Sequence, residues 1–139
     1  MKTILGDSVS FIESRLVGVG LNKNGKELTL FITLKGGTDV AIEMHNVDKL
    51  LINEFRQSNI IDEVNHWTHE SCTDELRQAV FYLTTGRSED ECDCKMLSVA
   101  TNALECINRG EMEIMEITAI FGAQILASFS SMTIRQKSD

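Results

Sequence analysis

The stretch from Gly110 to Arg135 is the part of this sequence that most constrains the fold. Large apolar and β-branched residues dominate it, and apolar residues recur at every second position, as at Ile125, Ala127 and Phe129. A period of two is typical of a β-strand, whose successive side chains point to opposite faces of a sheet. We therefore expect β-structure throughout this stretch.

The same stretch predicts a hairpin of two strands. Its turn signal is a Phe-Gly-Ala tripeptide at 121–123. Alternating apolar residues precede this turn at Met112 and Ile114, and they extend after it as far as Met132 and Ile134. Both faces of the hairpin carry apolar side chains, so other elements of the chain should cover part of each face.

Three alternating segments in the first third of the chain predict an antiparallel meander. The first, at 17–21, leads into an Asn-Lys-Asn-Gly turn, and the second, at 28–34, leads into Gly36-Gly37. Asn and Gly accept the positive φ that such turns need. With a third strand at 40–44, each segment has an apolar face and polar residues on the other face or at its ends, which predicts a half-buried sheet.

The middle of the chain carries a mixed signal. Val47, Leu50 and Phe55 have helical spacing after a polar cap, so we expect a short helix or turn near 47–56. A strand is expected near 59–67. The apolar residues of the first segment also allow extended structure there.

Two helices are expected next, near 73–85 and 89–109. Thr73 is a hydroxyl N-cap followed by acidic residues, and Gly86 ends the first helix. The second helix starts with a Ser-x-x-Glu capping box and carries apolar residues at helical spacing up to a terminal glycine. We expect this second helix to cover a face of the sheet.

The whole chain, residues 1–139, is predicted to be one α+β domain. The N-terminal meander and the C-terminal hairpin form a mostly antiparallel β-sheet, packed with two main α-helices. No apolar signal segment follows Met1, and no run approaches the ~20 apolar residues of a membrane span. We therefore expect a cytoplasmic protein without a membrane partner.

The charge of the chain narrows the choice of partners. It contains 21 acidic and 13 basic residues, which gives a formal net charge of −8. A protein that binds a phosphate backbone needs clustered Lys and Arg, so direct binding of nucleic acid is not expected. An acidic surface can simply keep a protein in solution, or it can complement a basic protein partner.

One set of side chains has the chemistry of metal ligands: His66, His69, Cys72, Cys92 and Cys94. Imidazole and thiolate are the ligands that zinc prefers, but no Cys-x-x-Cys pair is present. A small zinc-binding or hydrolytic enzyme using the first three residues is therefore the alternative hypothesis. No catalytic motif accompanies them, so we expect a protein that is not an enzyme and has no cofactor or catalytic residues.

Several segments together resemble a family of bacterial proteins. They are the meander with its Asn-Lys-Asn-Gly turn, the run Val-Asp-Lys-Leu at 47–50 leading to Asn-Ile-Ile at 59–61, and Phe-Gly-Ala-Gln-Ile at 121–125 before the final alternating strand. This combination is similar to the small cytoplasmic immunity proteins of polymorphic toxin systems, including those of contact-dependent growth inhibition. The likeness covers most of the chain and consists of structural patterns.

The resemblance implies a non-enzymatic domain that binds a cognate toxin domain and blocks its active site or the approach of its substrate. Many such toxins are nucleases, either RNases or DNases, with basic surfaces. The acidic balance of this chain fits a basic partner of that kind. The oligomeric state is left open.

Physical reasoning supplies the candidate toxin-binding residues, because the resemblance carries no map of the contacts. Acidic residues expected at the surface would steer a basic partner, and Trp67 would serve as an apolar anchor at the centre of the contact. The candidates are Asp62, Glu63, Trp67, Glu70, Glu89, Asp90 and Glu91.

Overall fold

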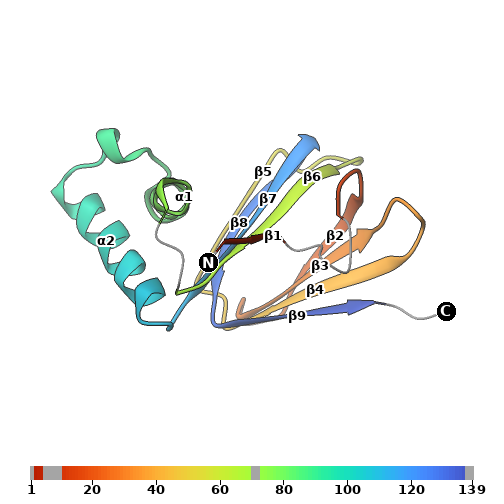
Figure 1. Cartoon of the computed structure of the whole chain (residues 1–139), viewed down its shortest axis with the longest axis horizontal. Helices are drawn as coiled ribbons and strands as arrows, with labels where there is room; N and C mark the ends of the chain where they lie inside the picture. The colour runs from red at the N-terminus through yellow and green to blue at the C-terminus, as the bar shows by residue number, and fades with distance from the viewer. Residues whose placement is uncertain (1, 5–10, 70–72, 137–139) are drawn as a thin grey trace.

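The structure is a computed structural model that describes residues 2–4, 11–69 and 73–136. Within these ranges the chain forms strands, two α-helices and one 3-10 turn (Figure 1). They are β1 (Lys2–Ile4), β2 (Arg15–Leu21), β3 (Glu27–Thr33), β4 (Asp39–His45), β5 (Lys49–Asn53), β6 (Ile60–Trp67), α1 (Asp74–Thr85), η1 (Glu89–Glu91), α2 (Cys94–Asn108), β7 (Glu113–Phe121), β8 (Gln124–Phe129) and β9 (Ser131–Gln136).

The strands form one antiparallel sheet that is not closed into a barrel. Its order is β5-β8-β7-β6-β2-β3-β4-β9, and β1 lies beside β6. The α+β class, the mostly antiparallel sheet and the two helices are therefore confirmed. The meander is confirmed as β2-β3-β4, and the hairpin around residues 121–123 is confirmed as β7-β8.

Two paired segments of the chain, β4-β5 and β8-β9, form a two-stranded ribbon that contributes strands to both ends of the sheet. Strands β4 and β5 follow each other in the chain but lie near opposite ends of the strand order, and the same holds for β8 and β9. The ribbon bends where Asn46 adopts a positive φ of 54°. Its hydrogen bonds continue around the bend, because Ser130 N–H donates to the His45 carbonyl and Asp48 N–H donates to the Ser128 carbonyl. Such a bend lets a strand pass from one layer to another.

The bend divides the sheet into two halves. We call β5-β8-β7-β6 the helical half-sheet and β2-β3-β4-β9 the meander half-sheet. Between β2 and β6 the pairing is limited to Arg15 and Ile60. Both halves contribute to one apolar core, in which Ile42 from the meander half-sheet and Val64 and Ile117 from the helical half-sheet are fully buried.

Helix α1 packs on the outer face of the helical half-sheet, and α2 packs on α1 (Figure 1). A second apolar cluster joins Leu76 and Val80 of α1 to Trp67, Ile114 and other strand residues. The expectation that the second helix covers the sheet is wrong for most of its length. Only the C-terminal end of α2, at Ile107, joins this cluster by a fully buried residue. In the described ranges, neither helix is long and apolar enough to cross a membrane.

Two other expectations in the middle of the chain are corrected. The helix or turn near 47–56 is instead strand β5, which pairs with β8. Leu50 and Ile52 pack against the core between the half-sheets, whereas Leu51 packs against the cluster under α1. Because both faces of β5 pack against apolar clusters, apolar residues occupy neighbouring positions of the strand. Their spacing happens to match the spacing expected on one side of a helix. The strand expected near 59–67 is confirmed as β6.

The remaining corrections concern where elements begin and end. The second strand of the C-terminal hairpin is interrupted at Ser130 and forms both β8 and β9. The second helix begins at Cys94, because Asp93 Oδ1 accepts the Met96 N–H at 2.9 Å and acts as the N-cap. Ser88 instead starts the 3-10 turn, where its hydroxyl donates to Glu91 Oε1 at 2.7 Å.

Candidate functional site

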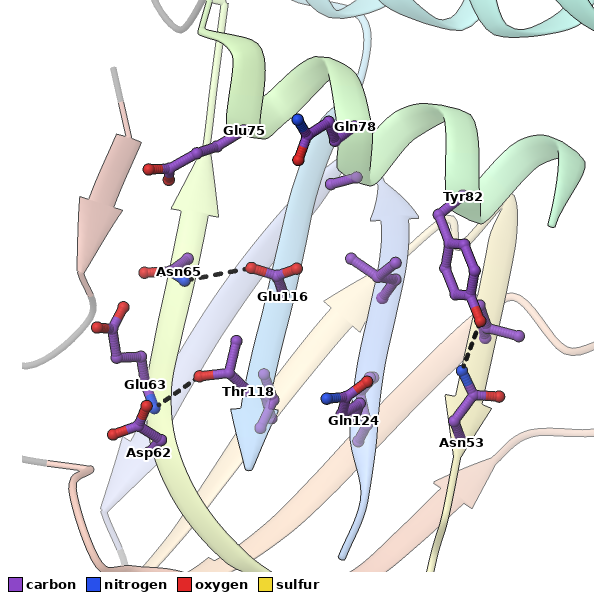
Figure 2. A pocket seen from close by; sticks show the side chains of 15 residues that line it. Asn53, Asp62, Glu63, Asn65, Glu75, Gln78, Tyr82, Glu116, Thr118 and Gln124 are labelled. Atoms are coloured by element: carbon purple, nitrogen blue, oxygen red, sulfur yellow. Dashed lines mark hydrogen bonds between the residues drawn. The ribbon is translucent and has the colours of Figure 1, made fainter. Parts of the chain in front are cut away.

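A groove of about 520 Å³ lies between α1 and the outer face of the helical half-sheet (Figure 2). Its floor is formed by the outward side chains of the strands, among them Glu116 and Thr118, which alternate along β7. Its wall is formed by Glu75, Gln78 and Tyr82, whose spacing places them on one side of α1. The groove therefore exists because α1 covers only part of this face.

The groove is acidic. Four of its side chains are carboxylates, and no lysine, arginine or histidine of the described residues lines it. The acidic side chains are Asp62, Glu63, Glu75 and Glu116. A cleft lined by one sign of charge concentrates the electric field and attracts groups of the opposite charge.

Neighbouring strands hold the polar groups of the groove in place. Asn65 and Glu116 are directly opposite on β6 and β7, and Asn65 Nδ2 donates to Glu116 Oε1 at 3.4 Å. Asn65 is only 3% exposed, and its Oδ1 has no hydrogen-bond partner among the described residues. Beside this pair, Glu63 N–H donates to Thr118 Oγ1 at 3.2 Å. The floor is thus built from paired backbone rather than from a loop.

Three exposed apolar residues lie at the end of the helical half-sheet beyond the groove, on the loop after β5 and at the end of β7. We call them the apolar tip, and they are Phe55, Ile120 and Phe121, which are 49%, 56% and 51% exposed. Ile120 follows Thr118 by two residues, so it continues the outer face of β7 beyond the groove.

Asn59 fixes the two loops that carry the apolar tip. This buried side chain accepts the N–H groups of Arg56 and Ala123 at 2.8 and 3.0 Å, and its Nδ2 donates to the Arg56 carbonyl at 2.7 Å. Arg56 also places its guanidinium carbon 5.4 Å from the centre of the Phe121 ring. The loop after β5 and the β7-β8 turn are therefore tied to each other.

The residues predicted from the sequence to bind a partner are only partly brought together. Asp62 and Glu63 line the groove. Trp67 is 1% exposed and packs under α1, so it is not the exposed anchor that we expected. Its ring faces outward on β6, but α1 covers this end of the strand. Glu70 lies outside the described residues.

The other predicted acids, Glu89, Asp90 and Glu91, lie on η1 and outside the groove. Glu89 accepts two hydrogen bonds from Arg77, at 2.7 and 2.8 Å. These hydrogen bonds hold the pKa of the exposed Glu89 carboxyl below its usual value. This carboxylate therefore links η1 to α1.

Sequence reasoning missed Glu75, Glu116 and the apolar tip. Glu75 was interpreted only as an acidic residue of a helix start. Glu116 stands between the buried residues Met115 and Ile117, so the alternation along β7 did indicate its outward direction. No sequence signal showed which outward residues α1 would leave uncovered.

The candidate metal ligands are dispersed over the described parts of the chain. His66 Nε2 is 2.5 Å from Glu113 Oε1, and the His66 ring stacks on Phe129 with 6.0 Å between ring centres. Cys92 donates to the Ser88 carbonyl. Cys72 lies outside the described residues, and within them no three His, Cys, Asp or Glu side chains form a group that could hold a metal ion.

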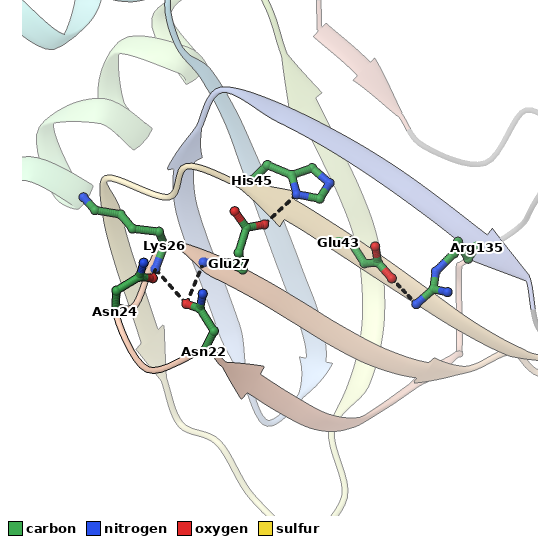
Figure 3. A network of polar contacts seen from close by, with 7 residues as sticks. All are labelled: Asn22, Asn24, Lys26, Glu27, Glu43, His45 and Arg135. Atoms are coloured by element: carbon green, nitrogen blue, oxygen red, sulfur yellow. Dashed lines mark hydrogen bonds and ion pairs between the residues drawn. The ribbon is translucent and has the colours of Figure 1, made fainter.

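The outer face of the meander half-sheet differs from the groove, because its acidic residues have basic neighbours (Figure 3). Glu27 Oε2 lies 2.6 Å from His45 Nδ1, and Glu43 forms an ion pair with Arg135. Close opposite charges reduce the field that a distant partner experiences. The lining of the groove, by contrast, includes no basic side chain among the described residues.

Comparison with known proteins supports the fold without naming a family. No protein family model matches the chain, and no curated protein matches its sequence. A solved structure described as an uncharacterized protein from Neisseria gonorrhoeae is similar, with a TM-score of 0.52, 13% sequence identity and 97% of each chain covered. At this identity the likeness concerns the fold alone, so function must be argued from the groove.

Proposed function

We propose that this protein is an immunity-type inhibitor that binds a basic toxin domain, such as an RNase or DNase domain, through the acidic groove and the apolar tip. The observation that carries the proposal is the groove lined by four carboxylates without a basic residue among the described ones. The net charge of −8 acts in the same direction. The resemblance of the sequence to immunity proteins supplies the class of partner.

The two parts of the surface have different tasks in this mechanism. The carboxylates speed the encounter with a basic surface, because opposite charges attract over distances of about a Debye length, ~8 Å at physiological salt. Contact with the apolar tip then removes Phe121 and its neighbours from water, which slows dissociation. The tip takes the anchoring role that the sequence had suggested for Trp67. A toxin held in this way loses access to its substrate.

Co-expression with the toxin encoded beside this protein tests the proposal. The wild-type protein should protect cells and co-purify with the toxin. The double variant Glu63→Gln and Glu116→Gln should bind the toxin at least about tenfold more weakly, because it removes two of the groove's charges.

The control removes the same amount of charge outside the groove, through Asp90→Asn and Glu91→Gln. This second double variant should bind the toxin as the wild type does. If the η1 variant loses protection and the groove variant keeps it, the toxin binds elsewhere. If the wild-type protein neither protects cells nor forms a complex at micromolar concentration, the proposed function is wrong.

A further inference from the structure

We infer that the groove recognises an arginine side chain, carried on an extended segment of the partner that also presents a large apolar residue to Ile120. The inference rests on the proposed function and specifies which part of the toxin the groove would bind. Its chemistry, however, concerns only the floor of the groove. Binding of a guanidinium group can therefore be measured without the toxin.

The acceptors on the groove floor suit a guanidinium group. On the paired strands β6 and β7, Glu63 lies opposite Thr118 and Asn65 lies opposite Glu116, so the two glutamates are diagonal neighbours. Diagonal positions of this kind are roughly 7–8 Å apart. A planar guanidinium has five N–H donors in a wide fork and can bridge two such carboxylates, whereas an ammonium group is a compact point charge.

Asn65 provides a second and independent indication of a missing donor. It lines the groove, is 3% exposed, and has an Oδ1 atom without a hydrogen-bond partner among the described residues. A buried acceptor without a partner costs free energy, and native proteins satisfy most such atoms. In Figure 2 the amide nitrogen of Asn65 faces Glu116, and its oxygen points away from Glu116, on the side of Glu63.

The apolar tip sets the direction and the sequence of the bound segment. Ile120 lies two residues beyond Thr118 on the same face of β7, a step of about 6.6 Å along a strand. An extended peptide covers the same distance in two residues. A segment with arginine in the groove would therefore place the side chain two positions away on Ile120. The ligand class is an extended Arg-x-apolar segment.

The experiment is an NMR titration of the full-length protein with the blocked peptide Gly-Arg-Gly-Leu-Gly. The matched peptides carry lysine or citrulline in place of arginine, or serine in place of leucine. Amide signals of Glu63, Asn65 and Ile120 should shift with the arginine peptide. The lysine peptide should bind at least about fivefold more weakly, and the uncharged citrulline peptide more weakly still.

Protein variants locate the contact. The pair Glu63→Gln and Glu116→Gln should weaken binding of the arginine peptide at least about tenfold, and Ile120→Ser should remove the advantage of leucine over serine. The η1 pair Asp90→Asn and Glu91→Gln should change the affinity less than about twofold. A preserved amide spectrum of each free variant shows that it is folded.

Equal affinities for the arginine and lysine peptides, or shifts spread evenly over groove and η1 acids, would overturn the inference. So would unchanged peptide affinity in the groove variant. If only the proposed function is wrong, the arginine peptide still binds in the groove, but the protein neutralises no toxin. If the wild-type protein does not bind the arginine peptide and the groove variant still neutralises the toxin, only the inference is refuted.

Discussion

Gly122 occupies the β7-β8 turn because a larger residue does not fit there. Its φ is 89°, and a Cβ atom on it would lie 2.5 Å from Asn59 Oδ1 and 3.0 Å from Asn59 Cα. Left-handed backbone favours glycine, and hydrogen bonds hold the Asn59 side chain in place. The position combines an unfavourable dihedral angle for any larger residue with a steric clash.

Replacing Gly122 with alanine should lower the free energy of unfolding by about 2–4 kcal/mol. The control is Gly25→Ala, where φ is 71° but no atom lies within 4 Å of the added Cβ. That variant meets only the dihedral penalty and should lose about 1–2 kcal/mol. Urea unfolding of both variants measures the difference, and equal losses would show that Asn59 moves aside freely.

Residue types alone predicted the turns better than the site. Gly86 and the Asn-Lys-Asn-Gly turn at 22–25 were correctly placed, because positive φ depends on local backbone geometry. Trp67 could not be assigned in this way. Whether an outward strand residue is exposed depends on where α1 comes to lie, and that position is set by contacts distant in sequence.

At the scale of elements, the pair Arg77 and Glu89 joins η1 to α1 and makes this contact sensitive to pH. The pKa of the Glu89 carboxyl is lowered in the folded protein, first by its hydrogen bonds to Arg77. A lowered folded-state pKa means that the stabilisation is present above the usual value of 4.5 and is lost as pH falls through the folded-state value.

The difference in thermal midpoint between wild type and Glu89→Gln should therefore be positive near neutral pH and shrink in acid. Thermal unfolding followed by circular dichroism at a series of pH values measures it. Asp90→Asn is the control, because it removes a carboxylate from the same turn and leaves the hydrogen bonds between Arg77 and Glu89 in place. The difference should also fall with added salt, since the pair is exposed. A difference that is constant across the acid range would contradict the linkage.

Elements with one strong local sequence signal were predicted well. Elements whose residues pack against both apolar clusters, the core between the half-sheets and the cluster under α1, were not. Helix α1 has its hydroxyl cap at Thr73 and its glycine end at Gly86, as expected. Strand β5 was mistaken for a helix or turn, because Leu50 and Leu51 serve different apolar clusters. The break at Ser130 does have a sequence signal, because apolar residues alternate at odd positions up to Phe129 and at even positions from Met132, but we interpreted the segment as one strand.

At the scale of the whole molecule, the proposed complex should form more slowly as salt rises. The association rate constant should fall by about tenfold or more between low and high ionic strength, while the dissociation rate changes less. Stopped-flow mixing with the neighbouring toxin measures both rates. The groove variant Glu63→Gln and Glu116→Gln should show a weaker salt dependence. A salt-independent association rate would contradict electrostatic steering.

The sequence predicted the class of the fold and its antiparallel character, but not the arrangement of the two half-sheets. Alternation identifies strands, whereas the order β5-β8-β7-β6-β2-β3-β4-β9 depends on pairings between distant segments. The groove is a product of that order. The groove arises where α1 covers only part of the helical half-sheet. Two of its four acidic residues, Glu75 and Glu116, could therefore not be found from local sequence patterns.

The bent ribbon also determines when this chain can finish folding. Lys49 donates its backbone N–H to the Ser128 hydroxyl, and these two residues are 79 positions apart. Closing so long a loop is entropically unfavourable, and folds dominated by such distant pairs form slowly. On the ribosome, β2, β3 and β4 can pair early, but β5 must wait for β8. Until then the edges of β4 and β5 are open, and this is the stage at which the nascent chain is most exposed to aggregation.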